Sequence, residues 1–217
     1  KIVVVVDILR ATSCMVTAFD QGASALIPVI GLDEAFKYKE KGFLTAGERG
    51  GEKVPDFDMG NSPYDYLEQN LEKKKVVIST TNGTRAINLS KEAKHLVIGA
   101  FLNITAVAEF INRNSEDLLI VCAGWKGRVN LEDSLFAGAL MDKLGSTFFS
   151  DCDSVAVCKS LFNVYKNNIV GCLKSSAHAK RLLKLNKNAD QDLQYCAQVD
   201  VSQVVPLLSE NQLIAAQ

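Results

Sequence analysis

The sequence lacks a large net charge, a long hydrophobic run and the pattern of a secretion signal at its first residues, and each absence argues against a class of protein. Its 24 basic and 25 acidic residues give a formal net charge of -1 at pH 7, so we expect neither nucleic acid nor a membrane surface as a partner. No apolar run approaches the roughly 20 residues that a membrane-spanning helix needs. No charged segment followed by an apolar one opens the chain, as a signal peptide would. These absences leave a small molecule as the expected partner.

Paired cysteine motifs are also missing, and histidine is rare. The two histidines are His95 and His178. Six cysteines form no CxxC pair, and several stand in apolar patterns typical of buried free thiols: Cys14, Cys122, Cys152, Cys158, Cys172 and Cys196. Free thiols indicate a reducing compartment, so we expect a cytoplasmic protein.

What the sequence does contain is a recurring order of strand, polar loop and helix, which predicts an α/β fold with a largely parallel or mixed sheet. The 217 residues, 47% hydrophobic, are enough to bury a core in one domain over residues 1–217. Two packed lobes with a boundary near Gly145 are the alternative. Because the chain opens inside a predicted strand, the presence of residues before Lys1 in the full protein is left open.

The spacing of apolar residues predicts the individual elements. Strands are expected at Ile2–Val6, 25–30, 43–46, 76–80, 95–100, 118–123, 169–173 and 201–208. Helices are expected at 11–21, 32–41, 86–90, 104–112, from 131 onward, 152–165, Ala177–Leu185 and 190–198. Residues 47–66 are rich in glycine and proline, which predicts a long ordered loop of the kind that carries function.

The first predicted strand runs directly into polar residues. Ile2–Val6 has no polar alternation, which is typical of a strand buried on both faces of a sheet. Asp7 follows at its carboxyl end, the edge where open α/β sheets bind ligands. An acid there with Arg10 close behind suggests a metal and an anion. The alternative is that Asp7 caps the next helix and Arg10 pairs with it.

A second polar loop follows the strand at 76–80. Hydroxyls, backbone amides and a guanidinium stand there at the start of a helix, where the helix dipole favours an anion such as phosphate: Thr81, Asn82, Gly83, Thr84 and Arg85. The segment is not a P-loop, because no GxxxxGK[ST] occurs, so nucleotide binding is not implied.

Four carboxylates lie at predicted strand ends or in the loops that follow them: Asp7, Glu48, Glu132 and Asp133. Oxygen ligands from separate loops, with no histidine or cysteine cluster beside them, suit a hard cation such as Mg2+. The alternative for the last two is a helix start capped by Asn130.

The same loops carry five basic residues that could neutralise an anion of more than one charge: Arg10, Arg49, Arg85, Arg128 and Lys126. Any one of the arginines taken alone is better explained by a surface ion pair, and it is their joint placement after predicted strands that favours an anion site. His178 follows two serines, so it could cap a helix, touch phosphate or act as a general acid, whereas His95 opens a strand and is expected to be structural.

Two covalent phosphatase mechanisms find little support. Cys122 is not followed by the CxxxxxR loop of cysteine phosphatases, which favours a structural thiol. Asp7 lacks the DxD pattern of haloacid dehalogenase-type enzymes, because Leu9 holds the second position.

Taken together and in order, the motifs VVVVDILRATS, AGERGG with DFDMGNSP, STTNGTRA, VCAGWKGRVNLEDSLFAGAL, SSAHAKRLL, QYCAQVD and VVPLL resemble the 2-phosphosulfolactate phosphatase family, also called ComB-like. The resemblance covers nearly the whole chain. It implies a three-layer α/β/α fold and Mg2+-dependent hydrolysis of (R)-2-phospho-3-sulfolactate to 3-sulfolactate and phosphate, a step of coenzyme M biosynthesis. One departure is SSAHAKR, with Ala177 and Ala179 where a run like SSHGRR is expected.

The resemblance also implies site residues at the matching positions: Asp7, Arg10, Thr12, Glu48, Arg49, Asn61, Thr81, Asn82, Gly83, Arg85, Glu132, Asp133 and His178. We expect Arg10 and Arg85 to offset charge in the transition state and the amides around Asn82 to cradle phosphate. Two other functions stay open: a phosphatase for another phosphorylated hydroxy acid, and a non-catalytic anion-binding module. A homodimer is left open too.

Overall fold

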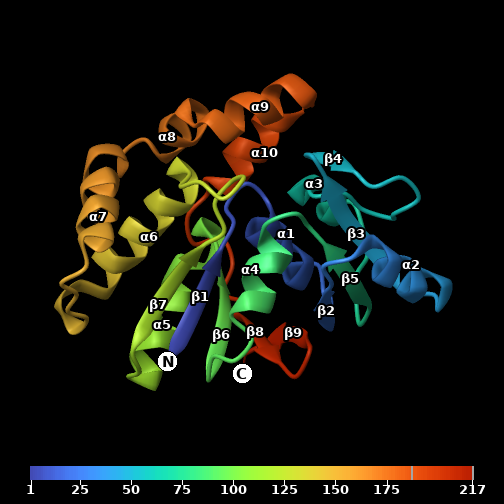
Figure 1. Ribbon diagram of the computed structural model, residues 1–217, viewed down its shortest axis with the longest axis horizontal. Helices are drawn as coiled ribbons and strands as arrows, with labels where there is room; N and C mark the ends of the chain where they lie inside the picture. The colour runs from blue at the N-terminus through green and yellow to red at the C-terminus, as the bar shows by residue number, and fades with distance from the viewer. Residues whose placement is uncertain (187, 217) are drawn as a thin grey trace.

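The computed structural model describes residues 1–186 and 188–216 as a nine-stranded sheet with helices packed on both faces (Figure 1). Side chains of the first strand, β1 (Ile2–Val6), alternate between two separate hydrophobic clusters. Val4 and Val6 join one cluster and Val3 and Val5 the other, so both faces of this strand are buried, as its uniform apolar run predicts. The fold is therefore a three-layer α/β/α arrangement.

The sheet has two parallel sets of strands joined by a hairpin. Its order is β4-β3-β5-β2-β9-β8-β6-β1-β7. Beside β1, the strands are β2 (Ala25–Pro28), β3 (Leu44–Arg49), β4 (Glu52–Lys53), β5 (Lys75–Ser79), β6 (His95–Gly99), β7 (Leu118–Cys122), β8 (Pro206–Ser209) and β9 (Gln212–Ala215). Strands β6, β1 and β7 are mutually parallel, as are β3, β5 and β2. The β8–β9 hairpin pairs antiparallel with β6 and β2, which makes the sheet mixed.

Helices follow most of the parallel strands. They are α1 (Ala11–Asp20), α2 (Leu32–Glu40), α3 (Pro63–Leu67), α4 (Gly83–Leu89), α5 (Ile104–Asn114), α6 (Leu131–Leu144), α7 (Asp153–Tyr165), α8 (Ile169–Ser175), α9 (Ala177–Leu185) and α10 (Ala189–Cys196), with short 3-10 helices at Phe101–Asn103 and Gly145–Thr147. Apolar residues of α5 and α6 share a cluster with Val4, and those of α1 and α4 share one with Val5. Among the described residues, no helix is both long and apolar enough to cross a membrane.

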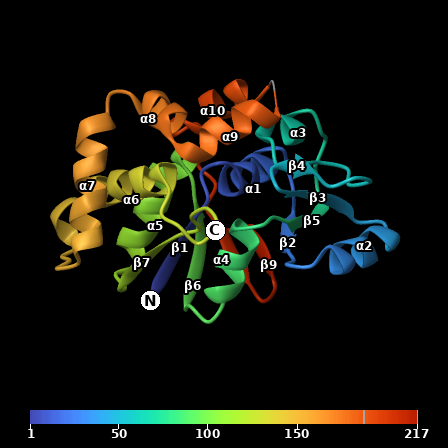
Figure 2. The same ribbon diagram turned by 45° about the horizontal axis from the view of Figure 1, so that its top comes forward.

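Helices α8, α9 and α10 form an arch across the top of the molecule, from α7 on one side to α3 on the other (Figures 1 and 2). The arch is held by apolar residues buried in the large cluster, among them Cys172, Leu173, Leu182 and Leu193. This placement carries α9 over the end of β1, where the polar loops emerge.

Three expectations about elements need correction. Residues 169–173 form the start of α8 and not a strand, because Asn168 caps the segment by accepting a hydrogen bond from Gly171 N. Of the strand expected at 201–208, only its end is present, as part of β8. The loop at 47–66 is partly regular, since it contains the end of β3, β4 and the short helix α3.

The expectation of one domain over 1–217, with a sub-lobe boundary near Gly145 as the alternative, stays a prediction. Lys187 and Gln217, which that range includes, lie outside the described residues.

Candidate active site

A cavity of about 130 Å3 lies where the loops after β1, β3, β5 and β7 meet helix α9. Its polar lining comes from segments far apart in the chain: Asp7, Arg10, Glu48, Asn61, Thr81, Asn82, Trp125, Lys126, His178 and Arg181. The structure therefore brings residues of four polar loops to one place. Leu9 and Leu182 add apolar surface to the same cavity.

Four carboxylates surround the end of β1. Asp7 is buried, and this burial raises the pKa of its carboxyl well above the ordinary value. The negative charges of Asp133, Glu48 and Glu132 raise it further, in that order. The other three expected metal ligands are thus close enough to Asp7 to repel its negative charge, an unfavourable interaction that a bound cation would relieve.

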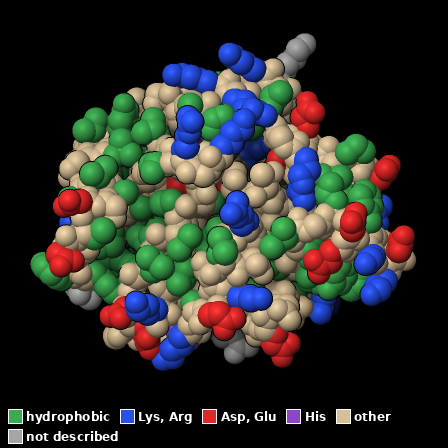
Figure 3. Space-filling model, viewed as in Figure 1, with side chains coloured by type: hydrophobic (Ala, Val, Ile, Leu, Met, Phe, Trp, Pro, Cys, Tyr) green, Lys and Arg blue, Asp and Glu red, His purple; other side chains and the backbone are tan. Residues whose placement is uncertain are grey.

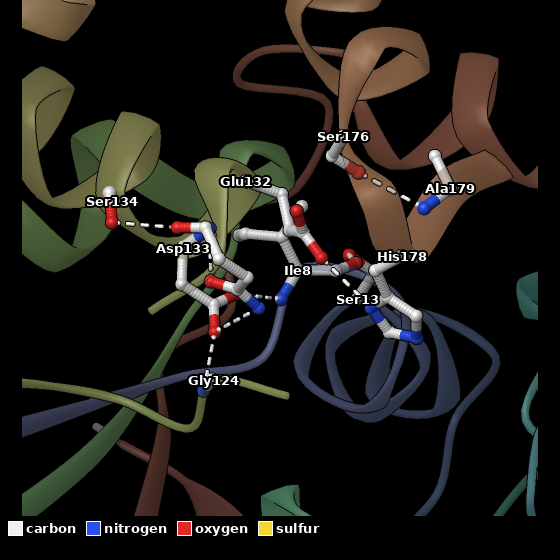
Figure 4. A network of polar contacts seen from close by, with 10 residues as sticks. Ile8, Ser13, Gly124, Glu132, Asp133, Ser134, Ser176, His178 and Ala179 are labelled. Carbon is white, nitrogen blue, oxygen red and sulfur yellow. Dashed lines mark hydrogen bonds and ion pairs between the residues drawn. The ribbon is translucent and has the colours of Figure 1, made fainter. Parts of the chain in front are cut away.

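Asp133 ties two loops together (Figure 4). Its Oδ1 accepts a hydrogen bond from Ile8 N at 2.9 Å, and its Oδ2 accepts from Gly124 N and Asn130 Nδ2, both at 3.0 Å. Burial and the charge of Glu132 raise the pKa of Asp133 to about 7. Asn130 is also the N-cap that the sequence predicts for α6, since its side chain accepts from Asp133 N at 3.3 Å. Asp133 therefore positions the loops after β1 and β7.

Glu48 links two further loops in the same way. Its Oε1 accepts from Thr81 N at 2.7 Å, and its Oε2 accepts from Gly51 N at 2.8 Å. The loop after β5 is thereby held against the end of β3, which places Thr81 and Asn82 at the cavity.

Glu132 and His178 form a hydrogen-bonded pair at the site. Glu132 Oε1 lies 2.8 Å from His178 Nδ1, so Nε2 is the ring nitrogen left for the cavity that His178 lines (Figure 4). Glu132 Oε2 is buried and has no hydrogen-bond partner among the described residues. A buried carboxylate oxygen without a partner costs free energy, which indicates that something else meets it. His178 does not cap α9, because Ser176 Oγ accepts from Ala179 N at 3.0 Å and takes that role.

The donor set fits a hydrated divalent cation better than a closed metal cage. Within residues 1–186 and 188–216, no three Asp, Glu, His or Cys side chains are arranged to hold a metal ion between them. Mg2+ keeps several waters and uses one or two carboxylates together with substrate phosphate. Asp7 lines the cavity and Glu132 carries the orphaned oxygen, so these two carboxylates are the ones that the site offers to a cation.

The expected phosphate loop approaches Asp7 closely. A Cβ on Gly83 would lie 2.7 Å from Ala11 Cβ and 3.1 Å from Asp7 Oδ2, so only glycine lets this loop pack against the loop after β1. Thr84 stabilises the conformation of this loop. Its Oγ1 donates a hydrogen bond to Thr80 O at 2.6 Å, and its amide donates one to Thr80 Oγ1 at 3.1 Å.

Several expected site residues lie elsewhere. Arg85 and Arg128 are exposed and do not line the cavity. Arg49 donates to Ser79 O at 3.1 Å and to Ile30 O at 2.9 Å, so it braces the backbone. Thr12 also has a structural contact, because its Oγ1 accepts from Asp7 N at 3.1 Å.

Arg10 lines the cavity, but its partner is not Asp7. Its guanidinium pairs with Asp192 of α10, a buried carboxylate that also accepts from Ser62 Oγ at 2.6 Å. The alternative in which Arg10 pairs with Asp7 is therefore wrong.

Sequence reasoning assigned no role to two residues of the cavity. Trp125 is the only tryptophan in the sequence, and it stands in a glycine-flanked turn after β7. Arg181 follows His178 by three residues, which places both on the same face of α9. The uniqueness of the tryptophan and the helical spacing of Arg181 from His178 are the signals that could have identified them.

Comparison with known proteins shows the family of this chain. Residues 1–211 match the family model described as 2-phosphosulpholactate phosphatase. A protein of Caldanaerobacter subterraneus subsp. tengcongensis named probable 2-phosphosulfolactate phosphatase is 38% identical over 213 residues, which cover 96% of this chain and 88% of that protein. Proteins with the same name from Thermotoga maritima and Nostoc punctiforme are 40% and 34% identical, and the matches cover 94% and 99% of this chain and 88% and 91% of theirs. The chain therefore belongs to the 2-phosphosulpholactate phosphatase family.

Proposed function

We propose that the protein is a phosphoric monoester hydrolase that converts (R)-2-phospho-3-sulfolactate to 3-sulfolactate and phosphate with Mg2+ as its cofactor. The observation that supports the proposal most is the gathering of three further carboxylates around buried Asp7, with a buried oxygen of Glu132 that has no hydrogen-bond partner among the described residues. The names of the relatives support the substrate. A role in coenzyme M biosynthesis follows from that substrate and is part of the proposal.

In this proposal Asp7 and Glu132 hold the cation, while the oxygens of Glu48 and Asp133 accept hydrogen bonds from backbone amides of the surrounding loops. Bound there, Mg2+ would neutralise charge on the phosphoryl oxygens and make a water more acidic. Thr81 and Asn82 line the cavity next to Asp7 and would contact the phosphoryl group. Arg10 adds positive charge beside it, although it is shared with Asp192.

His178 is the proposed general acid. A hydrolysed phosphate ester releases an alkoxide, which needs a proton as the bond to phosphorus breaks. In the doubly protonated imidazolium, Nδ1–H donates to Glu132, and Nε2–H is left to give its proton to the alkoxide as the ester bond breaks. Glu132 would then have two tasks, orienting the imidazole with Oε1 and binding the cation with Oε2.

A direct test is phosphate release from phosphosulfolactate, phospholactate and phosphoglycolate, with Mg2+ and with a chelator. The proposal predicts release from phosphosulfolactate that is fastest of the three, lost with the chelator and restored by Mg2+. Faster release from an ester without a sulfonate would support a different hydroxy acid substrate. No release from any ester would support a non-catalytic anion-binding module.

The attack on phosphorus has two routes. Either a water attacks directly, or Asp7 attacks first and forms a phosphoaspartate that water then hydrolyses. Acid quenching of a reaction with radiolabelled substrate would trap label on the protein in the second route and leave none in the first. A cytoplasmic location and a homodimer stay predictions.

A further inference from the structure

The turn that carries Trp125 is tightly defined. Trp125 and Arg128 exchange two backbone hydrogen bonds, of 2.9 and 3.0 Å. The two residues between them, Lys126 and Gly127, have φ angles of 52° and 70°, as in a type I′ turn. Gly124, at the base of the turn, donates to Asp133 at 3.0 Å. Asp133 therefore fixes this turn relative to the end of β1.

Two cations and the site histidine gather at the indole of Trp125. His178 stacks on it with a centroid distance of 5.8 Å and an interplanar angle of 14°. Lys126 Nζ lies 5.0 Å from the ring centroid and Arg181 Cζ lies 5.6 Å from it, both within the range of a cation–π interaction. Arg181 also donates to Gly50 O at 3.1 Å, which bridges the cavity mouth from α9 to the loop after β3.

The charges of the cavity are separated. Carboxylates come from the strand ends and the start of α6, whereas Lys126 and Arg181 come from the turn after β7 and from α9. Figure 3 shows Lys and Arg side chains gathered at the top of the molecule, where α9 lies. The third cation, Arg10, is already paired with buried Asp192, so Lys126 and Arg181 are the cations best placed to meet a ligand.

We propose that Lys126 and Arg181, held by Trp125, form a second anion subsite that binds the oxyanion of the substrate that is not hydrolysed. This inference rests on the proposed function. The chemical class is a carbon-bound oxyanion, a sulfonate or a carboxylate, attached close to the phosphorylated carbon. Arg181 has five N–H donors and the structure gives it one hydrogen bond among the described residues, so donors remain for such a group.

The test compares Arg181→Gln and Lys126→Gln with Lys180→Gln, a matched control on the same helix whose side chain is exposed and does not line the cavity. Three esters separate the possibilities: phosphosulfolactate, 2-phospholactate and isopropyl phosphate, which has no second anion. Because a hydrogen bond to a charged group is lost, kcat/KM for the first substrate should fall about 10- to 100-fold in the two cavity variants. Isopropyl phosphate should be hydrolysed as by the wild type.

Measuring ligand affinity provides a second test, which does not depend on turnover. The affinity for 3-sulfolactate, measured by calorimetry, should fall by a similar factor in Arg181→Gln and stay unchanged in Lys180→Gln. A fall for sulfolactate but not for lactate would assign the subsite to the sulfonate, and equal falls would assign it to the carboxylate.

Each failure has its own signature. If the variants lose activity equally on all three esters and still bind 3-sulfolactate as the wild type does, the subsite proposal is wrong. If the wild type hydrolyses none of the esters, the proposed function is wrong. The calorimetric measurement with 3-sulfolactate then still decides whether Lys126 and Arg181 bind the anion.

Discussion

At the scale of single residues, the site places three carboxylates close enough to Asp7 to repel its negative charge. Asp7 is a buried carboxyl whose pKa is raised first by burial and then by Asp133, Glu48 and Glu132. Such a group destabilises the fold when it is ionised and unpaired. In the proposed function the same features prepare Asp7 to meet a cation or a phosphoryl group, so that stability would be exchanged for activity.

The variant Asp7→Asn separates these two effects. It should lower kcat/KM at least 100-fold, because an amide neither binds a cation as a carboxylate does nor acts as a nucleophile. It should also raise the melting temperature of the chelator-treated protein, since it removes one buried negative charge. Phosphate release and a thermal melt measure the two quantities, and wild-type turnover would reduce Asp7 to a structural role.

Stability should also depend on pH in a defined direction. A carboxyl whose pKa is higher in the folded than in the unfolded protein binds more protons when folded, so stability falls as pH rises through that window. For Asp133 the window runs from the ordinary value of 3.8 to about 7. A carboxyl with a lowered pKa, such as Asp58, acts in the opposite direction. It stabilises the fold when it is ionised, and it loses that stabilisation only as pH falls below its ordinary pKa.

Urea denaturation of the chelator-treated protein should therefore give a lower free energy of unfolding at pH 8 than at pH 5. Asp7→Asn should make this difference smaller. A free energy that rises from pH 5 to pH 8 would contradict the electrostatic account of the site.

At the scale of elements, the arch of α8, α9 and α10 completes the site. Helix α9 supplies His178 and Arg181, and α10 supplies the carboxylate that pairs with Arg10. The Arg10–Asp192 pair joins the loop after β1 to a helix about 180 residues later in the chain. The arch is thereby attached to the loop that carries Asp7.

Asp192→Asn should destabilise the protein by about 3–5 kcal/mol, because it leaves the buried Arg10 guanidinium without its counter-charge. The control is Asp190→Asn on the same helix, whose ion pair with Lys174 is solvent-exposed and should matter little. Chemical denaturation of both variants provides the comparison. Equal effects would mean that the buried pair does not hold the arch.

At the scale of the whole molecule, the C-terminal hairpin joins the two parallel sets of strands. Strand β9 pairs with β2 through Leu26 and Leu213, and β8 pairs with β6 through Val97 and Leu207. Asp7 follows β1 of one set, whereas Glu48 lies near the end of β3 and Thr81 follows β5, both of the other set. The relative position of the two halves of the site therefore depends on this hairpin.

Leu213→Ala should cost about 2–5 kcal/mol, because Leu213 is fully buried in the core cluster and its truncation leaves a cavity. Gln212→Ala is the control, since that side chain is only partly buried and its one side-chain hydrogen bond among the described residues is to exposed Lys75. Urea denaturation measures both. A loss below 1 kcal/mol for Leu213→Ala would show that the hairpin does not carry the contact between the two sets.

The sequence by itself determined the elements whose signals are local. The apolar run Ile2–Val6, the Asn130 cap and the helix Ala177–Leu185 match the structure because periodicity and capping act within a few residues. The same reasoning placed four carboxylates at strand ends, and the structure brings them together. It assigned 169–173 wrongly, since a short apolar run suits a strand and a buried helix equally well.

Only the tertiary structure decided which side chains meet. No local pattern could pair Arg10 with Asp192, join Glu132 to His178, or set Arg181 beside Trp125, because those contacts depend on how distant elements pack. Packing likewise directed Arg85 and Arg128 to solvent although their loops lie at the site. The spacing of apolar residues along the sequence indicates whether a segment is a helix or a strand. The partner of a charged side chain depends instead on which distant elements the fold brings within reach.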